Sequence, residues 1–510
     1  MHGLQTDHGE LNNSLFHINK MDLMLIVSPA HALSVHMPYY HLYLAGYMEK
    51  KGISVMIVAP HYKSRHENVA YILNQVKTVK PKYIGLSCFV TDYNIVHDLA
   101  VNIKKISDAP LLVGNAHPSI APQDFLYAGS PFDIVVRGEG EETLTEIIRS
   151  GGDIKTLNNI NGIAYFDGSS VVITKNRTLM NMADCGQPAY HLLDMSWYTK
   201  PSKYLIRKLA TICATIYTGR GCPYDCTFCA SNTVWRTNDR APGGSYIRHR
   251  PLSAVMEELS LLQNKYGFDF FYILDDTFGI RESDIIDFCN EYKKSGLKML
   301  WAAESRANCI KNPEVVKIMK DSGCIQLDFG VETGSQKLLD IINKKLKVQQ
   351  IIQAFDLCHQ FGIRTFANML LNLPQEDEED LVLSHQLLER IRPTYISVGL
   401  TQPYPGTAIY KSLGITIDKE DYHLLDRLFP PEKFRLSSHK LNLQKLLYQW
   451  QLKYKTFCFF ERSMVSADGT YWKKIAFSKS RGRYFWFLVK TFIGTPVIYL
   501  KALYERRHLL

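Results

Sequence analysis

The sequence of 510 residues lacks the motifs of several common protein classes. Residues 1–20 are polar and do not contain the apolar stretch of a secretory signal. No P-loop, no H-E-x-x-H motif and no Ser-His-Asp set is found. The net charge is +9, and most of it lies in one segment, because nine Lys/Arg and one Glu fall between Tyr471 and Leu510. Since the rest of the chain is close to neutral, no nucleic acid partner is expected.

Cysteines are scattered, except for three of the eleven. Cys222, Cys226 and Cys229 have the spacing C-x3-C-x2-C, which is one ligand short of a closed four-cysteine site. This spacing favours an iron–sulfur cluster with one iron open to another ligand. Two alternatives stay open: a zinc site completed by His249, and a disulfide, although three crowded cysteines pair poorly. The cysteine usage fits a reducing cytosol.

Short apolar strands alternate with helices over residues 22–150. The predicted strands are Asp22–Val27, Ser54–Val58, Tyr83–Ser87, Leu111–Val113 and Ile134–Val136. The predicted helices are Tyr40–Lys50, Asn68–Val79, Asn94–Ile106 and Glu141–Ile148. This alternation predicts a doubly wound, flavodoxin-like parallel sheet. Ligands of such sheets bind at the carboxyl ends of the strands.

A linker and a second α/β region follow. Within residues 151–209 the only regular structure predicted is a hairpin, Ile163–Phe166 with Val171–Thr174. Residues 210–410 contain six strand–helix units, and residues 411–510 are expected to form a helical extension. The predicted strands are Thr211–Tyr217, Phe270–Leu274, Met299–Ala303, Gln326–Val331, Thr365–Leu371 and Tyr395–Leu400.

The cysteine stretch from Gly219 to Ala230 resembles the signature of radical S-adenosylmethionine (SAM) enzymes, including the aromatic Phe228 before the third cysteine. The resemblance implies a partial (β/α)6 TIM-type barrel and a 4Fe–4S cluster on the three cysteines. It also implies that the open iron chelates SAM, and that electron transfer splits SAM into methionine and a 5′-deoxyadenosyl radical. The cofactors would carry this chemistry, while the protein orients them.

Polar residues follow the predicted barrel strands at their carboxyl ends, where such barrels place functional groups. The patterns resemble those of the same family, which implies that these residues join Phe228 in the SAM site. Asp275 or Asp276 would accept a hydrogen bond from the methionine amino group. Arg306, assisted by Ser305, would bind the carboxylate bidentately. Glu332 would accept from the ribose hydroxyls. The alternative for each residue is a helix cap or an exposed salt bridge.

Three loops of the first region resemble those of cobalamin-binding domains fused to radical SAM barrels. They are the Ser87 loop, Gly114-Asn-Ala-His-Pro118 with His117, and Val136-Arg-Gly-Glu-Gly-Glu141 with Gly138 and Glu139. Glycine at a strand end lets the backbone approach a ligand closely. The D-x-H-x-x-G motif of a histidine ligand to cobalt is absent. The resemblance therefore implies cobalamin without a histidine ligand, or a domain that has lost the cofactor. The alternative is that the loops are ordinary tight turns.

The stretch Tyr484–Leu500 is aromatic and apolar, but Lys490 and Pro496 make it a poor membrane span. Either it lies in a membrane interface against anionic lipids, or it docks on the barrel as a helix. The protein is expected in the cytoplasm, and the first alternative adds peripheral contact with the inner membrane face.

The leading hypothesis from the resemblance is a cobalamin-dependent radical SAM methyltransferase that acts on an unactivated carbon. Two alternatives are a non-methylating rearrangement or oxidative cyclisation, and a non-catalytic cobalamin or redox sensor. A tRNA methylthiotransferase is disfavoured, because its extra N-terminal cysteines and basic RNA-binding appendage are not evident. The expected partners are a small-molecule or lipid-like substrate and a reductant such as flavodoxin or ferredoxin. No motif identifies the substrate.

Overall fold

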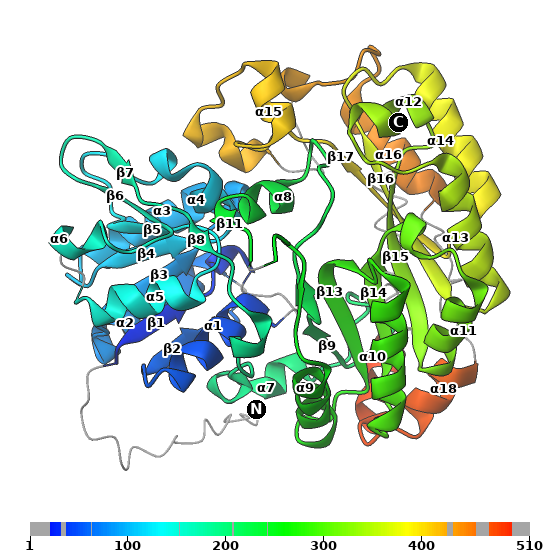
Figure 1. Ribbon diagram of the computed structural model, residues 1–510, viewed down its shortest axis with the longest axis horizontal. Coiled ribbons are helices and arrows are strands. Elements are labelled where there is room, and N and C mark those ends of the chain that lie inside the picture. The colour runs from blue at the N-terminus through cyan, green and yellow to red at the C-terminus, as the bar shows by residue number, and fades with distance from the viewer. Residues whose placement is uncertain are drawn as a thin grey trace, which may run out of the picture.

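The computed structural model describes residues 21–31, 37–62, 64–151, 154–206, 209–241, 243–425, 432–454 and 469–491. Two α/β units lie side by side, the N-terminal one on the left of Figure 1 and the barrel-like one on the right. The predicted fold class is confirmed: a flavodoxin-like parallel sheet is followed by a partial (β/α)6 barrel and a helical extension.

The N-terminal sheet has the strand order β2-β1-β3-β4-β5, and all five strands are parallel. The strands are β1 Leu23–Ile26, β2 Val55–Val58, β3 Tyr83–Ser87, β4 Leu111–Gly114 and β5 Ile134–Val136. The helices are α1 Tyr39–Lys50, α2 Arg65–Val79, α3 Tyr93–Lys104, α4 Ala116–Ile120 and α5 Glu141–Arg149. Helix α2 begins earlier than predicted because of a capping box: the Ser64 hydroxyl accepts from the Glu67 N–H (3.0 Å), and the Glu67 carboxylate accepts from the Ser64 N–H (3.2 Å).

The predicted hairpin extends this sheet to seven strands. Strand β6 (Ile163–Phe166) pairs antiparallel with β5, and β7 (Val171–Ile173) pairs with β6. Without the hairpin, β5 would be an exposed edge strand. The remaining elements before the barrel are short: α6 Ile154–Leu157, β8 Arg177–Thr178 and α7 Met195–Tyr198.

The barrel sheet contains six parallel strands in sequential order from β9 to β17. They are β9 Cys213–Ile216, β13 Phe270–Phe278, β14 Leu300–Ser305, β15 Cys324–Glu332, β16 Arg364–Leu371 and β17 Tyr395–Leu400. The helices on its outer side are α9 Leu252–Asn264, α10 Glu282–Lys294, α11 Pro313–Asp321, α13 Val348–Gln360 and α14 Glu378–Ile391. Strands β13 and β14 run further than predicted, so that Asp275, Asp276 and Ser305 belong to the strands themselves.

One hydrophobic core runs through both units. The Tyr43 ring on α1 packs at a tilt against the Tyr217 ring, which follows β9, with ring centroids 4.0 Å apart. The Tyr43 hydroxyl donates to the buried Glu258 on α9 (2.8 Å), and Arg250 pairs with the same carboxylate (2.5 Å). Burial of this shared apolar surface is expected to hold the two units together as one body.

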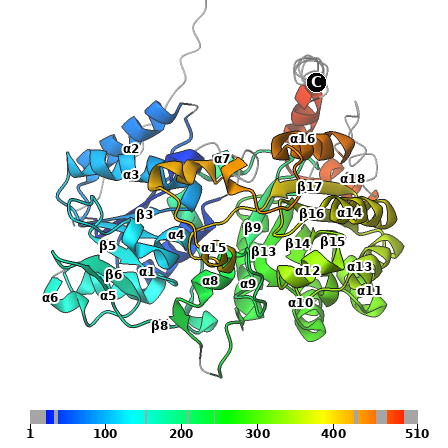
Figure 2. The same ribbon diagram turned by 90° about the horizontal axis from the view of Figure 1, so that it is seen from above.

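The C-terminal extension contacts both units. The segment with α15 (Ala408–Leu413) and residues 417–425 bridges them (Figures 1 and 2), and Tyr422 and Leu425 enter the second core cluster of the N-terminal unit. Helix α16 (Leu443–Tyr454) packs on β17. Helix α18 (Gly469–Ala476) and the helix at 481–491 cover the start of β9 and β13, where the Tyr484 hydroxyl accepts from the Ile212 N–H (2.8 Å).

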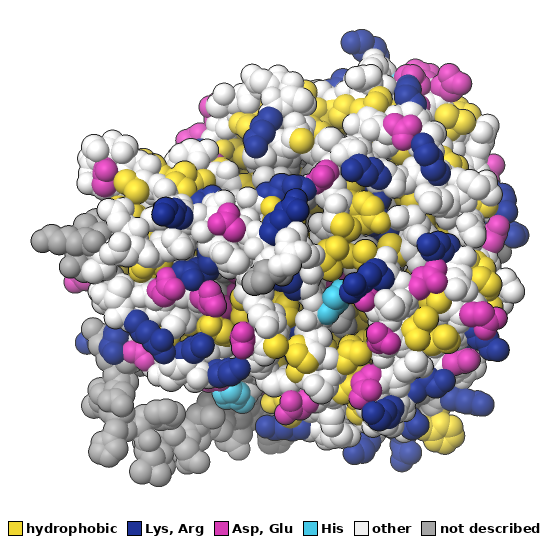
Figure 3. Space-filling view, in the orientation of Figure 1, with side chains coloured by type: hydrophobic (Ala, Val, Ile, Leu, Met, Phe, Trp, Pro, Cys, Tyr) yellow, Lys and Arg dark blue, Asp and Glu magenta, His cyan; other side chains and the backbone are white. Residues whose placement is uncertain are grey.

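Of the two alternatives for Tyr484–Leu500, a helix docked on the barrel is observed up to residue 491, and residues 492–500 lie outside the described residues. No helix in the described part of the chain is both long enough and apolar enough to cross a bilayer. Basic and acidic side chains are interspersed over the face in Figure 3, so this face presents no field of one sign.

Candidate active site between the two units

The cysteine loop leaves the barrel after β9 and is held by tight backbone packing. Strand β10 (Gly219–Arg220) pairs antiparallel with β12 (Arg248–His249), and α8 (Ala230–Trp235) begins directly after Cys229. Gly221 has φ +95°, and a Cβ there would lie 1.9 Å from the Tyr246 carbonyl oxygen. Only glycine fits this position, which explains its place directly before Cys222.

The three cysteines of the loop are free thiols. Cys226 is buried, and Cys222 and Cys229 are half-buried. Burial raises the pKa of Cys222 and of Cys229, so a ligating metal would have to replace the proton. The Arg306 guanidinium lies 3.8 Å from the Cys226 sulfur. The disulfide alternative is therefore not supported.

The three thiols fit a cluster better than one ion. Within the described residues, no group of three His, Cys, Asp or Glu side chains surrounds a single-ion position. His249, the candidate fourth zinc ligand, has its Nε2 3.5 Å from Asp284. Three free thiols on one short loop are the donor set of a 4Fe–4S cluster with one open iron.

Asp275 and Asp276 are tied to the base of this loop. Asp275 accepts from the N–H groups of Thr218 (2.7 Å) and Gly219 (3.2 Å), and burial raises its pKa to about 6 although these bonds lower it. Asp276, half-buried, accepts from the Gly221 N–H (3.0 Å) and the Trp235 indole N–H (3.0 Å). Burial also raises the pKa of Asp276. Both carboxylates thus brace the cysteine loop.

Arg306 is the predicted residue that fits SAM best. Its guanidinium lies over the Tyr224 ring, 3.5 Å from the centroid, and donates to the Lys344 carbonyl. It is buried, and no carboxylate pairs with it among the described residues. A buried guanidinium beside Cys226 with no counter-charge suits the carboxylate of a SAM molecule on the open iron. Ser305 instead donates to the Phe278 carbonyl (2.8 Å) and joins β14 to β13.

Glu332 and Phe228 meet at Lys344, a residue that the sequence patterns did not single out. The Lys344 ammonium lies 2.6 Å from the Glu332 carboxylate, and both side chains are buried. The Phe228 ring centroid is 5.9 Å from the same ammonium. Lys344 sits in a loop between Asn343 and Lys345, which both have positive φ, and no sequence motif marks it.

The predicted cobalamin residues divide into two groups. Ser87 and Gly114 are paired in register at the carboxyl ends of β3 and β4. Gly138, with φ +69°, follows β5, and a Cβ there would lie 2.1 Å from the Asn238 amide nitrogen. Glycine at position 138 therefore makes room for the Asn238 side chain, while Ser87 and Gly114 mark the strand ends where such sheets bind ligands.

His117 and Glu139 are engaged elsewhere. The His117 Nε2 lies 2.8 Å from the Asp124 carboxylate inside a cluster of Tyr93, Phe125 and Tyr422 rings. Tyr422 donates to the same carboxylate (2.8 Å) and so joins the C-terminal bridge to the N-terminal unit.

Glu139 belongs to a buried ion-pair group that links the β5 loop to the cysteine loop. Arg220 pairs with Glu139 (2.9 Å) and with Glu141 (2.6 Å), and Arg248 pairs with Glu139 (2.8 Å). Burial disfavours the charged Arg220, but Glu141, Tyr217 and Glu139 more than offset it and raise its pKa. We call these four residues, Glu139, Glu141, Arg220 and Arg248, the interdomain latch. Sequence reasoning missed it because its paired residues lie 79 to 109 residues apart in the chain.

Comparison with known families decides the assignment. Residues 216–388 match the radical SAM superfamily, and residues 30–148 match the B12 binding domain. This chain belongs to the cobalamin-binding radical SAM enzymes. Its cofactors are accordingly a 4Fe–4S cluster, SAM and cobalamin, which fits the free thiols and an Arg306 that has no carboxylate partner among the described residues.

Relatives share most of the chain. An uncharacterized methyltransferase of Pyrococcus horikoshii is 28% identical over 387 residues, covering 74% of this chain and 81% of the relative. The anaerobic magnesium-protoporphyrin IX monomethyl ester cyclase of Cereibacter sphaeroides is 25% identical, covering 76% of this chain and 61% of the relative. The radical SAM methyltransferase TsrM of Kitasatospora setae, solved with cobalamin and a 4Fe–4S cluster, has a TM-score of 0.60 at 18% identity, covering 76% of this chain and 74% of that one.

Proposed function

We propose that this enzyme is a cobalamin-dependent methyltransferase that methylates an unactivated carbon of a small-molecule or lipid-like substrate. When bound, the cluster and SAM supply a 5′-deoxyadenosyl radical, and cobalamin supplies the methyl group. The observation that carries the proposal is the interdomain latch, which joins the cysteine loop to the β5 loop of the cobalamin-binding unit. The name of the Pyrococcus relative supports methyl transfer.

The chain's own residues would bind and orient the reactants. Arg306 would hold the SAM carboxylate, and Asp276, the less buried of the two aspartates, would accept from the SAM amino group. The Lys344–Glu332 pair would face the ribose. Ser87, Gly114 and Gly138 would approach the corrin through their backbone. An electron donor such as flavodoxin or ferredoxin would reduce the cluster.

The test is anaerobic reconstitution with iron and sulfide, then incubation with SAM, reductant and cobalamin. Methyl transfer to reduced cobalamin releases S-adenosylhomocysteine without any substrate, so mass spectrometry can detect it before the substrate is known. We expect 5′-deoxyadenosine and S-adenosylhomocysteine, with the former lost in Cys226→Ala. Cys358→Ala, which removes a buried thiol of α13, is the matched control. Deoxyadenosine with no S-adenosylhomocysteine would contradict methyl transfer.

That result would instead favour a rearrangement or oxidative cyclisation, in which cobalamin donates no methyl group. The name of the Cereibacter relative, a cyclase, favours this second candidate. Absence of both products from a protein with a full cluster would favour a cobalamin or redox sensor.

We further propose a cytoplasmic enzyme that contacts anionic lipid through its C-terminal helices. Residues 469–491 contain six Lys/Arg and no Asp or Glu. Four aromatic side chains of this segment are exposed: Trp472 (39%), Phe477 (84%), Phe485 (61%) and Trp486 (62%). Aromatic and basic side chains together favour the headgroup region of a bilayer. These helices cover the start of β9 and β13, whereas the cysteine loop follows the end of β9. Such contact would therefore hold the enzyme at the membrane surface without placing the cysteine loop against the lipid.

Flotation with phosphatidylcholine vesicles, with and without phosphatidylglycerol, tests this contact. We expect binding that needs phosphatidylglycerol and falls at high salt, and that is lost in the double variant Phe485→Ser/Trp486→Ser. Tyr62→Ser, which changes an exposed aromatic residue of the N-terminal unit, is the control. Full-length protein that stays with the soluble fraction would contradict the proposal.

A further inference from the structure

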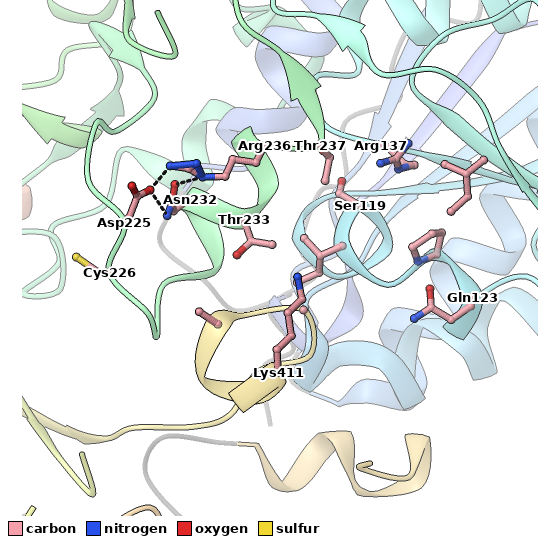
Figure 4. Close-up of a pocket in the computed structure, with 15 residues that line it drawn as sticks. Ser119, Gln123, Arg137, Asp225, Cys226, Asn232, Thr233, Arg236, Thr237 and Lys411 are labelled. Carbon is pink, nitrogen blue, oxygen red and sulfur yellow. Dashed lines mark hydrogen bonds and ion pairs between the residues drawn. The ribbon is translucent and has the colours of Figure 1, made fainter. Parts of the chain in front are cut away.

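A cavity of about 590 Å³ lies between the two units, beside the cysteine loop. Its walls come from the α4 region of the cobalamin-binding unit, from α8, and from α15 with the turn before it, where α15 contributes Lys411 (Figure 4). The Cys226 sulfur points away from Arg137 and Lys411 in this view. Asp225 and Cys226 nevertheless belong to the lining, so the cavity borders the cysteine loop directly.

The charged side chains of the cavity do not neutralise one another. Asp225 pairs with Arg236, as the dashed lines in Figure 4 show. That leaves Arg137 and Lys411, for which the described residues offer no carboxylate partner. The Nε and Nη1 atoms of Arg137 are buried without a hydrogen-bond partner, and its Nη2 lies 3.4 Å from the Asn176 amide oxygen. The cavity thus has two unneutralised cations.

A guanidinium with desolvated, unpaired N–H groups is costly unless an anion completes it. Burial lowers the pKa of Arg137, and no acidic group offsets this effect. Guanidinium N–H groups match phosphate bidentately, and a lysine adds a point charge. The hydroxyl side chains of Thr233 and Thr237 also line the cavity.

We propose that this cavity binds a phosphate group, held by Arg137 and Lys411. Arg137 directly precedes Gly138 at the carboxyl end of β5, so the cavity adjoins the predicted cobalamin edge. Two ligands could bring the same chemistry: the phosphodiester in the nucleotide tail of cobalamin, and a phosphorylated substrate. The inference goes beyond methyl transfer, because it concerns a binding equilibrium that can be measured whether or not the enzyme methylates.

The experiment measures three ligands with the full chain: radiolabelled orthophosphate by equilibrium dialysis, and hydroxocobalamin and dicyanocobinamide by fluorescence quenching. Cobinamide is a corrinoid without the nucleotide tail and its phosphate. The variants are Arg137→Gln, Arg137→Lys and Lys411→Gln, and the control is Lys317→Gln, an exposed lysine of α11. Because Lys411 is exposed, its substitution gives an answer even if Arg137→Gln fails to fold.

We expect Arg137→Gln and Lys411→Gln each to lower the affinity for orthophosphate or for hydroxocobalamin about tenfold or more. The affinity of Arg137→Lys should lie between those of wild type and Arg137→Gln. Weaker hydroxocobalamin binding with unchanged cobinamide binding would assign the site to the cobalamin tail. Orthophosphate binding that these variants abolish, and that survives loading with hydroxocobalamin, would assign it to a phosphorylated substrate. If neither orthophosphate nor hydroxocobalamin binds more weakly to these variants than to Lys317→Gln, the proposal is overturned.

Discussion

Arg306 is the residue that we propose to bind the SAM carboxylate. It is buried beside Cys226, stacks on Tyr224, and has no carboxylate partner within the described residues. Lysine keeps the charge but loses the planar fork that binds a carboxylate bidentately. We expect Arg306→Lys to weaken SAM binding to the reconstituted enzyme about tenfold or more. Equilibrium dialysis with labelled SAM measures this, and iron content checks that the cluster is intact.

Arg281→Lys is the control for this prediction, because Arg281 is an exposed arginine that pairs with Asp284 on α10. Equal SAM affinity in Arg306→Lys and Arg281→Lys would contradict a role of Arg306 in binding SAM.

The buried Asp275 is expected to make the free energy of unfolding fall as pH rises. Burial raises its pKa to about 6 in the folded protein, against a value near 4 in an unfolded chain. The folded state therefore keeps a proton that the unfolded state loses. Between about pH 4 and pH 6 the free energy of unfolding should fall by roughly 3 kcal/mol as pH rises, and it should change little above pH 6.

Asp275→Asn tests this dependence. Its amide oxygen can still accept from the N–H groups of Thr218 and Gly219, but the side chain stays neutral at every pH. The difference in melting temperature, Asp275→Asn minus wild type, should therefore be more positive at pH 7 than at pH 4.5. Asp287→Asn, an exposed residue of α10, should show no such change. A variant that tracks wild type across this range would refute the raised pKa.

At the scale of elements, the cysteine loop depends on one backbone position. Gly221 combines φ +95° with a carbonyl oxygen 1.9 Å from the place of a Cβ. We expect Gly221→Ala to displace the loop and to lose most of the bound iron, with a stability cost above the ~1–2 kcal/mol of left-handed strain alone. Iron per chain and the melting temperature are the measurements.

Gly267→Ala separates strain from steric conflict. Gly267 also has positive φ (+76°), but nothing lies within 4 Å of its Cβ position. It should therefore cost only about 1 kcal/mol and leave the iron content unchanged. Iron retention in Gly221→Ala equal to that in Gly267→Ala would mean that the loop tolerates a side chain at position 221.

The elements themselves were largely predictable, because the alternation of buried strands and helices is a local pattern. The predicted strands of both sheets are present, with ends shifted by a few residues. The extension of β13 to Phe278 was missed because Asp275 and Asp276 interrupt its apolar run. The cysteine ligands could also be predicted, because the C-x3-C-x2-C spacing within one short loop is itself typical of a cluster site.

Contacts between distant elements were not predictable in this way. Glu139 was assigned to cobalamin from its loop, yet its carboxylate is bound by Arg220 and Arg248 across the unit boundary. Lys344 carries no motif and acquires its place through left-handed turns on both sides. Such pairings depend on how the units pack, and one sequence alone contains no record of that.

At the scale of the whole molecule, the two units should unfold together. A continuous hydrophobic core and the interdomain latch join them. A ligand that binds only the native state stabilises everything that unfolds with its site, by about 2.7 kcal/mol at one hundred times its Kd. Hydroxocobalamin should therefore raise the temperature of a single calorimetric transition that includes the barrel.

The double variant Glu139→Gln/Glu141→Gln tests what couples the units. It leaves Arg220 and Arg248 buried without counter-charges, which should cost roughly 3–5 kcal/mol. If the latch transmits the coupling, this variant should show a barrel transition that no longer shifts with hydroxocobalamin. Glu142→Gln, which changes a half-exposed partner of Arg177, should keep the single shifted transition. Two transitions in the wild-type protein, with only one moved by hydroxocobalamin, would mean that the shared core and the latch do not make the units one cooperative body.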